Sequence, residues 1–205
     1  IYLMLEKIIA ILATWIMGVI STMGYGGIVL LMAIESACIP LPSEIIMPFA
    51  GFLVFKGEMV LWMVAVAGAL GCVVGSIPAY YLGMYGGRPL VEKYGKWVLI
   101  SHKDLKWADH AFEKHGDIII FIGRLLPAVR TFIAFPAGMA RMHMGKFILY
   151  TFVGSLIWCY LLAFAGFKMG EHWESLKVYF HEFHYVIAGA GLIFVIWYLK
   201  RHFKH

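Results

Sequence analysis

The sequence predicts an all-α integral membrane protein with about four spanning helices, two re-entrant helical hairpins arranged as an inverted repeat, and one interfacial amphipathic helix. Hydrophobic residues make up 62% of the 205 positions and the mean hydropathy is +0.82, whereas a soluble domain has about 45–50% apolar and about 25% charged residues. Only 14% of the residues are charged here, which is too few to cover a water-facing surface. The hairpins are predicted from two places where Pro and charged residues interrupt apolar sequence.

One membrane domain is expected over residues 4–205, beginning at Met4, which resembles a native start. An apolar run from Ile8 to Met23 follows two charged residues and lacks a small-x-small cleavage site. We therefore interpret it as a retained membrane helix, at the short end of the ~17–25 residues that a span needs.

Residues 24–58 are predicted to form an outer re-entrant hairpin. Two apolar stretches are each too short to span a bilayer, and the sequence between them carries prolines and two carboxylates. Backbone that leaves a helix at membrane depth must be buried in protein or line a cavity. Glu35 falls at the end of the first half-helix, where the helix dipole disfavours negative charge. Ser43 and Glu44 are candidates to cap the returning half-helix.

A spanning helix over about Met59–Tyr85 follows, with small residues recurring on one face, as close helix packing requires. Residues 88–115 mix Trp, Leu and Phe with lysines and acids, which is typical of a cytoplasmic helix lying at the interface. A further span is expected at about Phe147–Phe167. A last spanning helix, about Phe183–Leu199, and a basic tail complete residues 183–205.

Residues 116–145 are predicted to form the second, inner re-entrant hairpin. Arg124 and Arg130 lie in an apolar stretch that Pro127 and Pro136 prevent from forming one helix. An arginine at bilayer depth costs from ~2.5 to more than 10 kcal/mol, so it persists only where it faces a protein interior or a water-filled cavity. The alternative is an interfacial loop whose arginines reach lipid headgroups, but the apolar flanks favour depth.

The two hairpins share an order of features. Each has an interrupted apolar segment, then an Ala-Gly pair, and then a spanning helix with a Gly-Ser pair; the charged residues are acids in the first copy and bases in the second. This order predicts a structural repeat. The pairs are Ala50-Gly51 and Ala137-Gly138 for Ala-Gly, and Gly75-Ser76 and Gly154-Ser155 for Gly-Ser.

The distribution of lysines and arginines along the chain predicts that both termini are cytoplasmic. With four spans and two hairpins that do not cross, twelve of these residues fall in cytoplasmic segments and only Lys56, Lys168 and Lys177 lie outside. The hairpins are then inverted copies, as in transporters whose buried site opens to either side. The net charge of +5 follows from this topology and requires no nucleic-acid partner.

Neither cysteines nor histidines indicate a metal site. Cys38, Cys72 and Cys159 are an odd number, all inside apolar segments, which is typical of free thiols. The histidines show no ligand spacing, and no cofactor is expected.

Two motifs closely resemble those of the DedA family of bacterial membrane proteins. They are Glu35 with the Pro-Leu-Pro-Ser-Glu turn at 40–44, and the F-x-G-R-x-x-P-x-x-R run at 121–130. The resemblance covers about residues 10–170. It implies a protein of the bacterial cytoplasmic membrane that translocates phosphate-bearing lipids, with links to the proton-motive force. It also implies four essential residues: Glu35, Glu44, Arg124 and Arg130. Other branches have Asp in place of Glu44.

The leading hypothesis is a non-enzymatic flippase for a lipid phosphate, with undecaprenyl phosphate, recycled for cell-wall synthesis, as the first choice. Arg124 and Arg130 would bind the headgroup, because a guanidinium fork matches phosphate oxygens. Glu35 and Glu44 would neutralise the arginines in the empty state and take up protons on substrate entry; a permanent Glu–Arg lock is the structural alternative. The expected partners are the headgroup and bilayer lipids, and a homo-oligomer is left open.

Three alternatives stay open: a flippase or scramblase for a phospholipid such as phosphatidylethanolamine, a proton or cation antiporter that uses the same acids, and a membrane lipid phosphatase. The phosphatase is least favoured, because it needs a nucleophile or metal beside the arginines and the sequence offers no convincing one.

Overall fold

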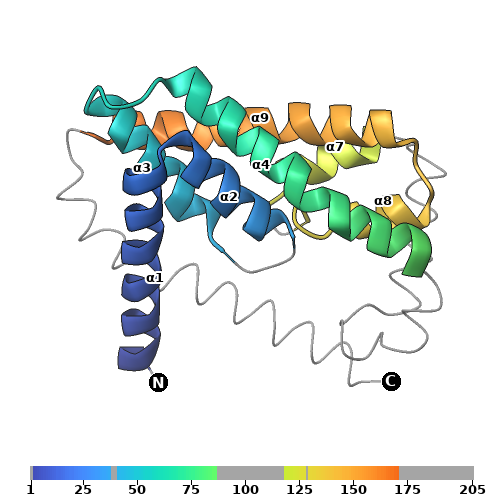
Figure 1. Ribbon diagram of the computed structural model, residues 1–205, viewed down its shortest axis with the longest axis horizontal. Helices are drawn as coiled ribbons and strands as arrows, with labels where there is room; N and C mark the ends of the chain where they lie inside the picture. The colour runs from blue at the N-terminus through green and yellow to red at the C-terminus, as the bar shows by residue number, and fades with distance from the viewer. Residues whose placement is uncertain (1, 38–40, 87–117, 128, 171–205) are drawn as a thin grey trace. The chain divides into compact units, whose positions relative to one another are not determined.

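The computed structural model describes residues 2–37, 41–86, 118–127 and 129–170, with side chains from residue 11 onward. Every regular element in these residues is a helix, so the all-α prediction is confirmed for this part of the chain (Figure 1). Contacts define a first compact unit, Ile1–Phe167, and every contact reported below lies within it. The helices are, in order, α1 (Tyr2–Met23), α2 (Tyr25–Ser36), α3 (Ser43–Phe55), α4 (Leu61–Tyr81), the π-helix η1 (Leu82–Gly86), α7 (Ile118–Leu125), α8 (Ala134–Met139) and α9 (Met144–Lys168).

The first helix ends at a glycine turn. The predicted run Ile8–Met23 is part of α1, and Gly24 follows it with φ of +58°, a left-handed conformation that residues with a side chain rarely adopt. The turn packs α2 against α1, where a Cβ at Gly27 would lie only 2.7 Å from the carbonyl oxygen of Val19. Two glycines therefore allow two helices to follow each other with one residue between them.

The first predicted hairpin contains α2 and α3, of 12 and 13 residues. Pro42 is the N-cap of α3, and its carbonyl oxygen accepts from the backbone N–H groups of Ile45 and Ile46 at 3.0 and 3.3 Å. The expected cap at Ser43 is wrong, because Ser43 is already the first helical residue and no side chain caps this helix.

The second predicted hairpin contains two shorter helices, α7 with 8 residues and α8 with 6. Between them the chain turns tightly: the backbone N–H groups of Val129 and Arg130 both donate to the carbonyl oxygen of Leu126, at 3.1 and 3.0 Å. Phe132 N–H donates in turn to the carbonyl oxygen of Val129 at 3.0 Å. Part of the backbone N–H and C=O groups of this connection are therefore hydrogen-bonded to one another, as a non-helical segment in apolar surroundings requires.

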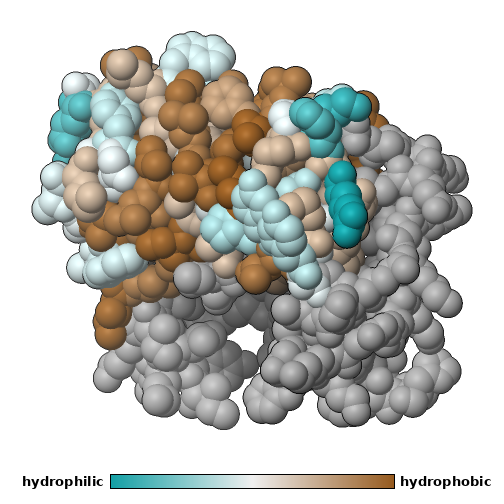
Figure 2. Space-filling model, turned by 45° about the vertical axis from the view of Figure 1, so that its right-hand side comes forward, coloured by the Kyte–Doolittle hydropathy of each residue, from teal (hydrophilic) through white to brown (hydrophobic). Residues whose placement is uncertain are grey.

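Two of the four predicted spans fall on helices long and apolar enough to cross a membrane: Leu61–Gly86, formed by α4 and η1, and Met144–Lys168, which is α9. Figure 2 shows hydrophobic residues over much of the described surface, with hydrophilic residues toward its margins. On both long helices, exposed apolar residues recur every four positions, as expected of a helix face in contact with lipid. They are Trp62, Val66, Leu70 and Val74 on α4, and Leu149, Val153, Ile157 and Leu161 on α9.

Two other predicted segments lie outside the described residues. These are the interfacial helix at 88–115 and the last span at Phe183–Leu199 with its basic tail.

The long helices α4 and α9 lie side by side and run in opposite directions (Figure 1). Near the end of α4, the rings of Tyr80 and Phe147 have centroids 4.7 Å apart. Near its start, the rings of Trp62 and Tyr160 are also 4.7 Å apart. Residues early in one helix therefore meet residues late in the other.

Glycines bring the second helix of each predicted hairpin against the long helix of the other half of the chain. A Cβ at Gly51 in α3 would lie 1.9 Å from the carbonyl oxygen of Ala163 in α9, and a Cβ at Gly138 in α8 would lie 1.9 Å from the carbonyl oxygen of Tyr80 in α4. Such short distances mean that the helix backbones are in direct contact, as small residues permit in membranes. Gly51 and Gly138 hold equivalent places in the two halves, so the packing is reciprocal.

Replacing Gly51 or Gly138 with Ala is expected to destabilise the protein, because each new methyl group would overlap a carbonyl oxygen of the facing helix. Overpacking of this kind costs about 1–3 kcal/mol. Gly26→Ala is the control, because nothing lies within 4 Å of a Cβ there and Ala is the better helix former. Thermal unfolding in detergent measures the effect, and equal melting temperatures for the three variants would contradict the close contacts.

Candidate functional site

Arg130 lies in the turn between α7 and α8 and is buried, with 2% of its surface exposed. The turn that begins at Leu126 directs its side chain into the protein, where Nη2 donates to Oε2 of Glu35 at 3.0 Å. The same nitrogen lies 3.6 Å from the Cys72 thiol. One edge of the guanidinium is therefore held by groups from α2 and α4.

Glu35 is in the last turn of α2 and is 4% exposed. Its position at a helix C-terminus is electrostatically unfavourable, and the ion pair with Arg130 compensates for it. A buried ion pair is a weak contributor to stability overall, but removing one partner strands the other charge. The ion pair therefore holds the α7–α8 connection against the C-terminal end of α2.

Arg124 is in the last turn of α7 and is 1% exposed. Its Nη2 donates to the hydroxyl oxygen of Ser76 at 2.5 Å, and that hydroxyl donates to the carbonyl oxygen of Cys72 at 2.5 Å. Gly154 gives the arginine room, because a Cβ there would lie 2.7 Å from Cβ of Arg124. The Gly-Ser pair of each long helix thus contributes one residue to the surroundings of this arginine.

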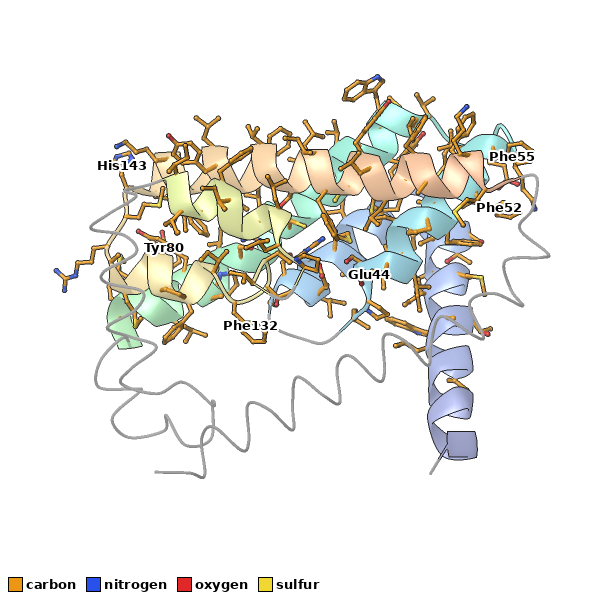
Figure 3. All side chains as sticks on the ribbon, turned by 180° about the vertical axis from the view of Figure 1, so that it is seen from behind. Glu44, Phe52, Phe55, Tyr80, Phe132 and His143 are labelled. Carbon is orange, nitrogen blue, oxygen red and sulfur yellow. The ribbon has the colours of Figure 1, made fainter. Side chains whose placement is uncertain are left out.

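Glu44 is the second residue of α3 and is half-buried. Figure 3 labels it near the start of this helix, and labels Phe132 in the α7–α8 connection. The charge of Glu44 acts on Glu35 and on Arg130, and the charge of Arg124 also acts on Glu35. Glu35 therefore lies within electrostatic reach of the other three residues singled out in the sequence.

Trp158 belongs to the same region and was not identified from the sequence. The guanidinium carbon of Arg130 lies 5.5 Å from the centroid of its ring, in the range of a cation–π contact. The one available signal was spacing: Trp158 follows Gly154 by four residues and so shares its helix face. Ser76 and Cys72 were identified only as a packing residue and a free thiol.

Some buried donors in this region lack an acceptor. Nη1 of Arg130 and Nε1 of Trp158 are both buried, and neither has a hydrogen-bond partner within the described residues. Leaving a buried N–H without an acceptor costs about 1–3 kcal/mol, and more for a charged group. An anionic ligand that accepted hydrogen bonds from both donors would remove this free-energy cost.

The arrangement is suited to binding an anion. Arginine presents only donors and stays charged at any relevant pH. The part of the chain that the structure describes contains no group of three or more His, Cys, Asp or Glu side chains able to hold a metal ion. Two guanidinium groups and two carboxylates are thus the charged groups that the structure places in this region.

The fold and this region define a class: a helical membrane protein with two arginines and one carboxylate buried between its helices. Residues 41–168 match the VTT domain family, so the chain belongs to that family, and the resemblance to its bacterial DedA members is confirmed. No solved structure matches the chain.

Characterised and uncharacterised relatives cover most of the chain. It is 38% identical to the uncharacterised membrane protein YkoX of Bacillus subtilis over 87% of this chain and 79% of that protein. It is 34% identical to undecaprenyl phosphate transporter A of the same organism, over 83% of this chain and 82% of that one. It is 31% identical to an alkaline phosphatase-like protein of Lactococcus lactis over 88% and 87%. These relatives and the apolar helices show a membrane location.

Neutral replacement of one member of the Glu35–Arg130 pair is expected to destabilise the protein by about 3–5 kcal/mol, because the remaining charge is buried without a partner. The double variant Glu35→Leu/Arg130→Met is expected to lose much less than the sum of the single variants. A double-mutant cycle from unfolding in detergent measures this coupling. Strictly additive losses would mean that the two side chains do not interact.

Proposed function

We propose that this protein transports undecaprenyl phosphate across the bacterial cytoplasmic membrane, without breaking the phosphate ester. The observation that carries the proposal is the buried arginine pair, Arg124 and Arg130, in a chain 34% identical to a protein named undecaprenyl phosphate transporter A. A phosphate headgroup is an anion that guanidinium groups bind well. The polyprenyl tail is apolar and can stay in the bilayer while the headgroup passes through the protein.

We further propose that residues 24–58 and 116–145 are re-entrant hairpins related as an inverted repeat. Reciprocal packing supports this: Gly51 contacts the long helix of the second half, and Gly138 contacts that of the first. The charged residues also differ in sign between the halves. Two hairpins that enter from opposite sides would meet at mid-membrane, where transporters place their substrate.

In this topology both termini are cytoplasmic and Lys56 is outside. A cysteine introduced at Lys56 is expected to react with an impermeant thiol reagent added to intact cells, whereas one at Lys103 reacts only after permeabilisation. The native cysteines are first replaced by Ala or Ser in a variant shown to be active. Labelling of both positions from the same side of the membrane would contradict the inverted repeat.

Arg124→Lys and Arg130→Lys are each expected to slow translocation by roughly tenfold or more, although the charge is kept. Lysine offers a point charge where a planar fork is needed, and a charge-assisted hydrogen bond contributes about 1.5–3 kcal/mol. Arg141→Lys is the matched control, because Arg141 is exposed. The measurement is the flipping rate of a labelled polyprenyl phosphate in vesicles that contain equal amounts of protein. Wild-type rates in both buried-site variants would exclude phosphate recognition by these arginines.

Glu35 and Glu44 are the proposed proton-coupling groups. The two differ in their surroundings, since Glu35 is paired with Arg130 and Glu44 is half-buried at a helix start. Glu44→Gln is expected to fold normally and to abolish the response of flipping to an imposed pH gradient, because glutamine resembles the protonated acid. Glu35→Gln is expected to reduce the same response and also the melting temperature. A normal response in well-folded variants of both would exclude the carboxylates as coupling groups.

The same vesicle assay separates the alternatives. Phosphatidylethanolamine as the preferred cargo would indicate a phospholipid flippase, and a cation flux without lipid movement would indicate an antiporter. The name of the Lactococcus relative makes a phosphatase the enzymatic candidate. Release of inorganic phosphate from the lipid would identify that activity and contradict transport without bond cleavage.

A further inference from the structure

Trp158 of α9 packs its ring against the Arg130 guanidinium, one nitrogen of which is bound by Glu35. The Arg130 guanidinium carbon is 5.5 Å from the Trp158 ring centroid, and Nη2 of the guanidinium is bound to Glu35. Nη1 and the indole Nε1 are both buried and both without an acceptor in the described residues. Two donors of different chemical type therefore lie in one contact with their hydrogen-bonding capacity unused.

We propose that Trp158 is a substrate-binding residue, and that its indole N–H and Nη1 of Arg130 together hold oxygens of the transported phosphate. The inference rests on the proposed function, and adds to the arginines and carboxylates a neutral residue from α9. The ligand class is an oxyanion of the phosphate type, because both groups can only donate and so need an acceptor.

The neutral indole has a specific advantage at this position. The charge of Arg130 is already matched by Glu35 at 3.0 Å, and Arg124 is a second buried cation, so a further cation would add one more buried charge to be neutralised when the site is empty. An indole N–H adds a donor without a charge, and its strength does not change with pH. The indole would also let α9 contact the phosphate, in addition to Arg130 in the α7–α8 connection.

The alternative role for Trp158 is shielding, in which the ring covers the guanidinium through a cation–π contact and the N–H is incidental. Only the binding role requires the indole N–H group. A Phe at position 158 keeps an aromatic face over Arg130 and removes the N–H. A benzothienylalanine, which has sulfur in place of the N–H, keeps the bicyclic shape as well and serves if the Phe variant folds poorly.

The test is binding by the full-length protein in detergent micelles. The probes are geranylgeranyl phosphate, geranylgeraniol, which lacks the phosphate, and inorganic phosphate, which lacks the lipid. Trp158→Phe is compared with Trp62→Phe, because Trp62 is 61% exposed at the start of α4, whereas Arg124 binds Ser76 near the other end of that helix. The ¹⁵N–¹H signal of the Trp158 indole, assigned by its absence in Trp158→Phe, is followed in wild-type protein.

The expected result is that Trp158→Phe and the benzothienyl variant bind geranylgeranyl phosphate roughly tenfold more weakly, which corresponds to about 1.4 kcal/mol. Trp62→Phe binds as wild type, and geranylgeraniol binding is the same in all variants. The Trp158 indole signal shifts when the lipid phosphate is added, as a new hydrogen bond requires. An equal shift with inorganic phosphate would assign the contact to the phosphate group alone and leave the inference intact.

Two outcomes overturn the inference and are distinguishable. If both position-158 variants bind the lipid phosphate within twofold of wild type while Arg130→Lys binds weakly, Trp158 only shields the arginine and the proposed function stands. If wild-type protein binds geranylgeranyl phosphate no better than geranylgeraniol, the proposed function fails and the role of Trp158 fails with it.

Discussion

The cost of burying charge in an apolar protein determines how this chain is built. Arg124 and Arg130 are almost fully buried, and each is held by a polar group from another helix, Ser76 in one case and Glu35 in the other. Neither arginine could persist in hydrocarbon without such partners. The same constraint applies to the interruptions between α2 and α3 and between α7 and α8, because irregular backbone near a membrane interior must also be enclosed by protein.

The positions of the long helices and of the breaks could be predicted from the sequence, because each depends on residues close together in the chain. Apolar runs locate α4 and α9, and prolines with charged residues locate the breaks before α3 and α8. Contact between the acids and the arginines could be expected, since opposite charges in a low-dielectric interior attract strongly, but the sequence did not indicate which acid pairs with which arginine. The expected Ser43 cap failed because Pro42 ends the break one residue earlier than the serine would require.

The remaining part of the site depends on rotation and register between helices that are far apart in sequence. Ser76 binding Arg124, and Trp158 covering Arg130, require α4 and α9 to present particular faces to the α7–α8 connection. Nothing in the composition of a uniformly apolar helix fixes that face, because all sides satisfy a lipid environment equally well. Only the small residues give a hint, and they indicate where helices touch without identifying the partner helix.

The contact between Gly51 and α9 also has a consequence for the order in which the chain is synthesised and packed. The partner of α3 is α9, whose contact residue Ala163 is synthesised about 110 residues after Gly51. At the usual rate of about 5–20 residues per second this is a delay of roughly 6–20 s. During that time the Pro48–Gly51 face of a nascent chain has no protein to pack against, so lipid or the insertion machinery must cover it. Truncation of the last turns of α9 would accordingly remove contacts from α3, more than 100 residues earlier in the chain.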